Sequence, residues 1–587
     1  MAQNITADEL FGRIRELLTA TDLQPATRNS MMHEVLVLCC HEGVRDTEQS
    51  FGNLFSQVDF LCKRHRVGVS DKADIQTMRR HSNGSEPLAR EELLYDGRAL
   101  SIFVSAVMGK DIPSGLTEII PHTHRPRQTG QEINSRQVRC VVDGWDDNCL
   151  YATPDGETGG EQYAVRLRNE TDGTDHSYLT GIIRKGTQLN LLDCHIETET
   201  KADSGGRASG EGRGQRMLTA RIIVVEPDFL IDISSIAACF AEYGHHPMLY
   251  LLNQMKPRVN TQATLLGNFA GAALDDIVNS RGDYNMNDTV RSNFREKALE
   301  FTTCRDFNAQ KFYADALVQA GNLQRVVDIL FDHGNGGTDN LVPAPSPTGE
   351  ERGMALLEPS FVCEALGIQG RVDLMTTDMR LLVEQKSGRN MNIERGRPNI
   401  AYHSYQLEPH YVQLLLYYGV LRYNFRLGTN TVDIRLLYSK YPPKDGLMVV
   451  AYYHRLFLEA IAYRNRLVAM HFDIARKGFG RYVGELTPET LNVNGATDFF
   501  YNTYLRPPLE ELTAPLHRLT PLQRDYFNRM MTFVVREQLI GKVGSQEGTN
   551  TSSSDLWGMP LAEKRDTGNI YTGLRIMRKE RSSDYNG

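Results

Sequence analysis

The spacing of apolar residues changes along this sequence, and the change limits the folds that the chain can adopt. Residues 6–108 repeat apolar side chains at helical spacing, after a capping box formed by Thr6 and Glu9. From about 135 to 228 apolar and polar residues alternate, as they do in β-strands. Beyond residue 230 both patterns occur, and we find no internal repeat. The sequence therefore predicts an α/β multidomain protein.

We divide the 587 residues into four segments. An N-terminal helical domain is expected at 1–130, and a small OB-like β-barrel at 135–228, although an SH3-like barrel would show the same pattern. A mixed sheet flanked by helices is expected at 229–540, followed by a linker and the start of a further region at 541–587. Within the barrel, the glycine-rich stretch 201–216 is expected to be a mobile loop.

Composition excludes several classes of protein. The chain carries 65 Lys and Arg against 73 Asp and Glu, so a nucleic-acid site must be a local basic surface. No apolar run approaches the roughly 18–20 residues that span a bilayer, and the first residues do not resemble a signal peptide. We therefore expect a cytoplasmic protein without a membrane partner, nucleoid-associated if bacterial. Nine cysteines, an odd number, favour reduced thiols.

A charged hairpin is the feature that most suggests chemistry. Residues 368–375 and 380–386 are expected to form two strands joined by a tight turn. Glu384 and Lys386 are two residues apart, so they share one face of their strand, and Asp373 on the partner strand can join them. The alternative is an ordinary hairpin whose charged face is solvated.

This arrangement suits a divalent cation and a phosphodiester. Two carboxylates and the backbone carbonyl of Gln385 would offer oxygen ligands to Mg²⁺ or Mn²⁺. A lysine beside them could orient the attacking hydroxide next to a phosphate. A helix expected at 409–425 adds Gln413 and Tyr417, which lie four residues apart and hence on one face. Their simpler explanation is a boundary glutamine and a half-buried tyrosine.

Together these residues resemble the PD-(D/E)XK nucleases of the RecB type. Gly367–Asp373 resembles the glycine-flanked acidic motif of that family, Glu384–Lys386 its E-x-K motif, and Gln413–Tyr417 its Q-x3-Y helix. Within this group, residues 135–540 are similar to the nuclease half of the DNA replication ATP-dependent helicase/nuclease family. The resemblance implies a PD-(D/E)XK nuclease core that cuts single-stranded or flapped DNA with Mg²⁺ or Mn²⁺.

The resemblance also implies a role for each residue of the site. Lys386 would be the catalytic lysine, Gln413 would orient the site, and Tyr417 would touch DNA or brace Gln413. The metal ligands would be Asp373, Glu384, the carbonyl of Gln385 and, as an auxiliary acid, Glu358, whose alternative is a plain surface glutamate. A superfamily-1 helicase region, in cis or in trans, is the expected partner besides DNA. No G-x4-G-K-[ST] motif occurs, so we expect no ATP site in this chain.

The sequence departs from the family pattern at two places. Gly271 stands where the family usually has a histidine; Asp275 or Asp276 could replace it, or belong to a charged helix face, which we prefer. Cys239 matches the first cysteine of the family's iron–sulfur site, but no cysteine follows Cys363, so no cluster is expected. A catalytically degenerate DNA-binding scaffold is therefore the main alternative, and a helical scaffold without nucleic acid is a third.

Other residues have simpler explanations. Trp145, Tyr151 and Tyr163 in the barrel are candidates for base stacking or for the core. His124 lies in an apparent linker and is expected to be solvated. A helix is expected at 234–253. His245 and His246 are expected to follow a helix and to cap it.

Overall fold

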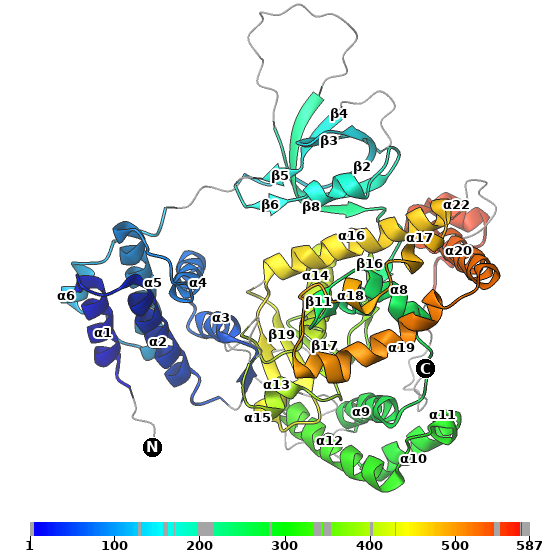
Figure 1. Ribbon diagram of the computed structural model, residues 1–587. Helices are drawn as coiled ribbons and strands as arrows, with labels where there is room; N and C mark the ends of the chain where they lie inside the picture. Colours follow the sequence, from blue (N-terminus) through cyan, green and yellow to red (C-terminus); the bar gives the residue numbers. More distant parts are fainter. Residues whose placement is uncertain are drawn as a thin grey trace, which may run out of the picture.

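The computed structural model describes residues 5–47, 49–126, 131–155, 162–169, 171–197, 215–280, 284–332, 342–343, 354–398, 403–428, 430–544, 552–575 and 577. The predicted α/β multidomain organisation is confirmed: N-terminal helices, a closed five-stranded barrel and mixed sheets flanked by helices follow one another (Figure 1). Residues 201–214 of the predicted mobile loop lie outside the described residues. None of the helices within these ranges is long and apolar enough to cross a membrane.

The N-terminal region is a helical bundle with its own apolar core. The predicted capping box is present. The Thr6 amide donates to the Glu9 carboxylate, and the Glu9 amide donates to the Thr6 hydroxyl. The prediction that this region is helical throughout is wrong at one point, where the chain forms the short strand β1 (Ser50–Phe51). The helices are α1 (Ala7–Thr19), α2 (Pro25–Gly43), α3 (Leu54–Arg64), α4 (Val69–Ser82), α5 (Arg90–Met108) and α6 (Ser114–Thr117).

The alternating segment closes into a barrel with strand order β2-β3-β4-β8-β7. Strands β4 and β8 pair in parallel, and the other pairs are antiparallel. The strand bounds are β2 (Ser135–Trp145), β3 (Cys149–Pro154), β4 (Gln162–Arg166), β7 (Gln188–Ile196) and β8 (Gln215–Val225). Between β4 and β7 lie β5 (Arg168–Asn169), β6 (Thr174–Asp175) and the 3-10 helix η1 (Ser177–Gly181).

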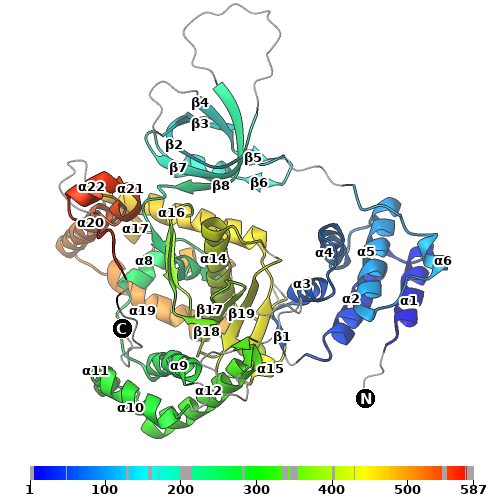
Figure 2. The same cartoon turned by 180° about the vertical axis from the view of Figure 1, so that it is seen from behind.

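A six-stranded mixed sheet forms the centre of the remaining chain, in the order β1-β20-β19-β18-β17-β14. Helices cover both of its faces, with α14 and α16 on one side and α9 and α12 on the other (Figure 2). The strands after β1 are β14 (Ala355–Leu357), β17 (Leu374–Thr376), β18 (Leu381–Lys386), β19 (Asp433–Tyr438) and β20 (Leu447–Val450). The four helices are α9 (Gln262–Asn279), α12 (Ala309–Leu330), α14 (Glu408–Phe425) and α16 (His454–Lys477).

The alternation along β18 determines which residues face which helices. Leu382 packs in the core beneath α14, whereas Leu381 and Val383 pack in the core beneath α9 and α12. Glu384 and Lys386 therefore share the face of Leu382, and Gln385 faces the opposite side. A second, three-stranded sheet lies beside this one. Its strands are β9 (Ile231–Asp232), β15 (Ser360–Cys363) and β16 (Ile368–Arg371).

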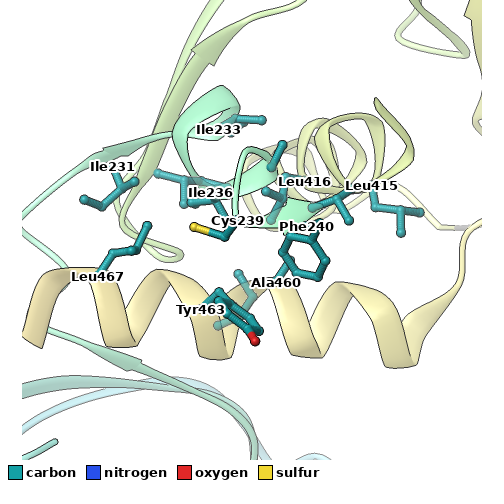
Figure 3. Packing of buried hydrophobic residues seen from close by; sticks show 14 of the residues in the cluster. Ile231, Ile233, Ile236, Cys239, Phe240, Leu415, Leu416, Ala460, Tyr463 and Leu467 are labelled. Carbon is teal, nitrogen blue, oxygen red and sulfur yellow. The ribbon is translucent and has the colours of Figure 1, made fainter. Parts of the chain in front are cut away.

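The prediction of a helix at 234–253 is wrong. The chain instead forms a short hairpin between two helices, because Gly244 adopts φ +144°, a conformation that L side chains rarely adopt, and a Cβ there would lie 2.5 Å from Val493 Cβ. The elements are α7 (Ile233–Ala237), β10 (Phe240–Ala241), β11 (Gly244–His245) and α8 (Met248–Met255). Cys239, just before the hairpin, is fully buried among apolar side chains of α7, α14 and α16 (Figure 3).

Shorter elements complete the fold. Between α9 and β14 lie α10 (Met286–Glu296), α11 (Ala298–Thr303), β12 (Phe331–Asp332) and β13 (Val342–Pro343). Helices α13 (Met391–Glu394) and α15 (Pro443–Gly446) connect strands of the sheet. The C-terminal elements are α17 (Gly480–Val483), α18 (Pro488–Leu491), the π-helix η2 (Tyr501–Leu505), α19 (Arg506–His517), α20 (Pro521–Val543), α21 (Asp555–Gly558) and α22 (Leu561–Asp566).

Candidate functional site

The predicted hairpin is present, but its first strand is divided. Residues 368–371 form β16 in the three-stranded sheet, and the chain then crosses to the six-stranded sheet as β17, which pairs antiparallel with β18. Asp373 lies at this crossing, half-buried. The carboxylate of Asp373 accepts a hydrogen bond of 2.6 Å from the Gln385 amide. In a continuous strand, a backbone carbonyl would have accepted this hydrogen bond. Asp373 is thus fixed against the end of β18.

Glu384 is the centre of the site. Its side chain is only 2% exposed, and its Oε1 accepts two hydrogen bonds of 2.6 Å, from Lys386 Nζ and from Gln413 Nε2. The predicted common face of Glu384 and Lys386 is confirmed, as is the approach of Gln413 from α14. The second oxygen, Oε2, is buried and has no hydrogen-bond partner among the described residues. A buried carboxylate oxygen without a partner is costly, so this atom is available to a ligand.

The electrostatics of the site favour binding of a cation. Burial and the nearby charge of Asp373 raise the pKa of Glu384 to about 8, and the Lys386 ammonium opposes this shift. Burial also raises the pKa of Asp373. Two carboxylates that are both destabilised as anions gain from a shared positive charge. The donor set, carboxylate oxygens in a buried position, fits a hard divalent cation such as Mg²⁺ or Mn²⁺.

The backbone of β18 adds a third oxygen. The carbonyl of Lys386 accepts from the Ser439 amide, on the side of β19. Backbone groups of successive strand residues point to opposite neighbours, so the carbonyl of Gln385 points toward Asp373. Strand β17 pairs with β18 only as far as Val383, so it ends before this carbonyl. The predicted ligand set of Asp373, Glu384 and the Gln385 carbonyl is therefore compatible with the geometry.

Glu358 approaches the site through its backbone. Its amide donates to the Asp373 carbonyl at 3.0 Å, and its φ of +47° places it in the left-handed region. Its carboxylate pairs with Arg371 at 3.0 Å and is 39% exposed. The charge of Glu358 contributes to the raised pKa of Asp373, so the two acids are near one another.

Tyr417 braces the strand that leads into the site. It is 3% exposed, and its hydroxyl donates to the Arg371 carbonyl at 2.5 Å. Its ring lies so close to Gly370 that a Cβ there would be 3.0 Å from it. The bracing that was expected of Tyr417 was of Gln413; the hydrogen bond of its hydroxyl is to the strand at Arg371. His410, three residues before Gln413, was missed: its spacing places it on the same helix face, and burial and the charge of Lys386 lower its pKa to about 3.

A buried polar network supports the far side of β18. The Ser439 hydroxyl donates to Gln319 Oε1 at 2.7 Å and accepts from Gln385 Nε2 at 3.3 Å. From the same helix as Gln319, Asn322 Nδ2 donates to the Ser439 carbonyl at 3.0 Å. These residues of α12 and β19 were not predicted, because they are distant in sequence from the E-x-K motif. Their polar side chains within a largely apolar helix were the only available signal.

Helix α9 passes beside the end of β18. A Cβ at Gly267 would lie 3.1 Å from Ser387 Oγ, so the helix backbone approaches the residue after Lys386. At Gly271, one turn further on the same face, no atom of the described residues lies within 4 Å of an added Cβ. Asp276 accepts a hydrogen bond from Thr289 of α10. Asp276 therefore contacts α10, and Asp275 is buried, so the preferred expectation of a charged helix face is wrong for Asp275.

A second cluster of acidic and imidazole groups lies in the N-terminal helices. Asp71, Asp74 and His124 bring their ligand atoms within 4.8 Å of one another. Arg98 Nη1 lies 3.0 Å from Asp71 and 3.6 Å from Asp74, so a guanidinium already supplies positive charge there. His124 is exposed, as expected for a solvated residue, but it also contacts these two aspartates at 3.4 Å.

Two comparisons of the sequence with known proteins identify no relative. A scan of the sequence against protein-family models gives no match, and no curated protein matches the chain either.

Proposed function

We propose that this chain is a metal-dependent DNA nuclease module with a PD-(D/E)XK-like core and an OB-like barrel. The observation that carries the proposal is the buried Glu384, whose Oε1 is held by Lys386 and Gln413 while its Oε2 lacks a partner among the described residues. A purely structural carboxylate would have both oxygens satisfied. The resemblance of the hairpin and of the Gln413–Tyr417 helix to the RecB-type motifs supports the same function.

Each residue has a definite part in this proposal. Asp373, Glu384 and the Gln385 carbonyl would hold Mg²⁺ or Mn²⁺, which when bound would neutralise phosphate charge and lower the pKa of a water ligand. Lys386, whose side chain is 22% exposed, stabilises negative charge that develops on the phosphodiester. Gln413 holds Glu384 in position, and Tyr417 holds the chain that enters Asp373.

The proposed substrate is single-stranded or flapped DNA. Trp145 in the barrel is 38% exposed and is available for base stacking, whereas the hydroxyl of Tyr151 is hydrogen-bonded to Asp146. The chain has no P-loop motif, so a superfamily-1 helicase region, in cis or in trans, would supply ATP-driven unwinding. This partner is proposed on the resemblance alone.

The test is a cleavage assay on single-stranded, duplex and flapped DNA with Mg²⁺, Mn²⁺ or EDTA. Cleavage of single strands or flaps that requires the cation and stops with EDTA is expected. Cleavage that persists in EDTA, or that is confined to duplex DNA, would contradict the proposal.

A degenerate site that binds DNA without cutting is the second candidate. It is favoured by Gly271, which stands where the RecB-type family usually has a histidine. If the wild type binds Mn²⁺ but does not cut, Gly271→His should restore cleavage, because no described residue has an atom within 4 Å of an added Cβ there and the side chain has room. Helix propensity favours the change as well, by about 0.5 kcal/mol over glycine. Gly321→His on α12, also without neighbours around an added Cβ, is the matched control and should not restore cleavage.

A further inference from the structure

A cleft of about 430 Å³ lies between the barrel and the helices beneath it. One wall is the end of η1 and the loop that follows it, and the other is the C-terminal half of α16 with α17. Figure 1 shows α16 running directly below the barrel, so the cleft lies between the barrel and the remaining α/β structure. None of the predicted site residues lines it.

The walls of the cleft are predominantly basic. Five cationic side chains line it, against three carboxyl groups: Arg184, Arg466, Arg476, Lys477 and Arg481 against Glu226, Asp473 and Glu485. Three of the cations share one carboxylate, since Asp473 lies 2.7 Å from Lys477, 3.2 Å from Arg481 and 3.8 Å from Arg476. Arg184 and Arg466 remain, one on each wall.

Aromatic rings, not carboxylates, hold these two arginines. The guanidinium of Arg184 lies 5.0 Å from the centre of the Phe472 ring, and that of Arg466 lies 5.1 Å from the rings of both Tyr178 and Tyr463. Within the described ranges neither guanidinium forms an ion pair with a carboxylate. Contact with a ring occupies the face of a guanidinium and orients it, while its N–H groups lie in the plane and can donate to an anion.

Glu226, which also lines the cleft, does not fully cancel this charge. Burial raises the pKa of Glu226 to about 7, against the opposing charge of Arg184, so Glu226 is only partly ionised at neutral pH. Planar guanidinium groups bind phosphate oxygens in a bidentate manner, which makes a phosphate the fitting ligand.

We propose that this cleft binds the phosphate backbone of a single-stranded nucleic acid, with Arg184 and Arg466 as its contacts on the two walls. Cations interleaved with aromatic side chains are typical of sites that follow a single strand without reading its sequence. A cleft of this volume has room for part of a single strand and not for a duplex. The proposed function enters this proposal only in the choice of nucleic acid as the ligand. The anion site itself is inferred from the two arginines.

The test measures binding of a labelled oligothymidylate by fluorescence anisotropy, in EDTA and over a range of salt concentrations. The Arg184→Gln, Arg466→Gln double variant should bind about tenfold or more weakly at 0.1 M salt. Its slope of log K against log [salt] should be shallower by about 1.4, since each phosphate contact on a single strand contributes about 0.7. Arg184→Lys with Arg466→Lys keeps both charges and should retain most of the slope, which separates lost charge from lost folding.

A matched control removes two charges elsewhere. Arg291→Gln with Arg529→Gln changes exposed residues of α10 and α20, and should leave affinity and slope nearly unchanged. A second arm uses competition by inorganic phosphate and by thymidine monophosphate. Weak competition by both supports a strand site, whereas displacement of the oligomer by either at micromolar concentration would identify a free-anion site and overturn the proposal.

The outcomes separate this proposal from that of nuclease activity. Binding that depends on Arg184 and Arg466 in a protein that never cuts supports the cleft and contradicts the nuclease. Cleavage by the wild type together with an unchanged salt slope in the double glutamine variant overturns the cleft and leaves the nuclease intact.

Discussion

At the scale of single residues, Glu384 is where burial, charge and hydrogen bonding conflict. One oxygen of its carboxylate takes two donors, while the other is buried without a partner in the described part of the chain. A buried polar atom left unsatisfied costs about 1–3 kcal/mol. A bound cation would remove that cost, which is why the site is better explained by a ligand than by the stability of the fold.

Removal of the carboxylates and removal of the lysine should have different effects. Asp373→Ala and Glu384→Ala should lose Mn²⁺ binding and cleavage together, because each deletes a ligand. Lys386→Ala should bind Mn²⁺ equally well or more tightly, since a competing cation 2.6 Å from Glu384 is gone, yet should cut about 10²–10³-fold more slowly. Calorimetric titration with Mn²⁺ beside a cleavage assay distinguishes the two.

Lys440 provides the control for this series. It follows β19 and lies 3.4 Å from Glu394, and Lys440→Ala should leave Mn²⁺ affinity and cleavage unchanged. If the Asp373, Glu384 and Lys386 variants all cut as fast as the wild type, the hairpin is only a charged face and the nuclease assignment is wrong.

At the scale of secondary-structure elements, His245 joins two helices. The expectation that it caps a helix is wrong: it lies in β11, 3.0 Å from Glu408 of α14 and 2.8 Å from Glu459 of α16. Burial would lower the pKa of His245, but its hydrogen bonds to both glutamates, and their charges, raise it to about 9. Nδ1 of His246, the residue expected to cap with it, accepts a hydrogen bond from the first amide of α8, so His246 caps the start of the helix that follows it.

This ion pair predicts a dependence of stability on pH. The pKa of His245 is higher in the folded than in the unfolded protein, so its protonation stabilises the fold. This contribution is fully present below pH 6.5 and is lost as pH rises through about 9. His245→Gln should therefore lower the free energy of unfolding by about 2 kcal/mol at pH 6, a value reduced for the exposure of Glu459. The difference should nearly vanish by pH 9.5. Urea unfolding at pH 6, 7.5 and 9.5 measures it.

His246→Gln is the control for this prediction. Burial lowers the pKa of His246, so its imidazole is neutral throughout the range from pH 7.5 to 9.5. The effect of His246→Gln on stability should be constant there. An effect of His245→Gln that is equally constant would show that the charge of His245 is not what joins the helices.

At the scale of the whole molecule, the N-terminal helices are attached to the central sheet by backbone hydrogen bonds. Strand β1 pairs in parallel with β20 at the edge of the sheet, and Gly52 exchanges further hydrogen bonds with Val449 and Tyr405. Val449 of β20 packs into the core of the N-terminal helices. The helical region and the sheet therefore share both strand pairing and apolar packing.

A chain that begins at residue 131 should consequently be less stable. It would expose the edge of β20 and the apolar surface of Val449, and exposed strand edges promote association. We expect the Tm to fall by more than about 5 °C and size-exclusion chromatography to show aggregates. A chain that ends at residue 544 lacks only peripheral elements such as α21 and α22, and should keep its Tm within about 2 °C. Equal Tm values for all three chains would contradict this account.

The sequence by itself determined the features that depend on neighbours along the chain. The capping box at Thr6, the alternating strands of the barrel and the common face of Glu384 and Lys386 follow from local geometry, because helices and strands have fixed periods. The helix that carries Gln413 was predicted to within one residue at its start, since Pro409 fits only the first turn.

Only the tertiary structure decided the rest, because it depends on residues that are distant in sequence. The break at Asp373 arises where one strand passes from one sheet to another, and neither sheet can be recognised from a local pattern. The Glu384 oxygen that has no partner among the described residues depends on which side chains of α14 reach β18. The place of β1 depends on β20, nearly 400 residues away. Local periodicity fixes which side of an element a residue faces, whereas long-range packing decides what that residue meets there.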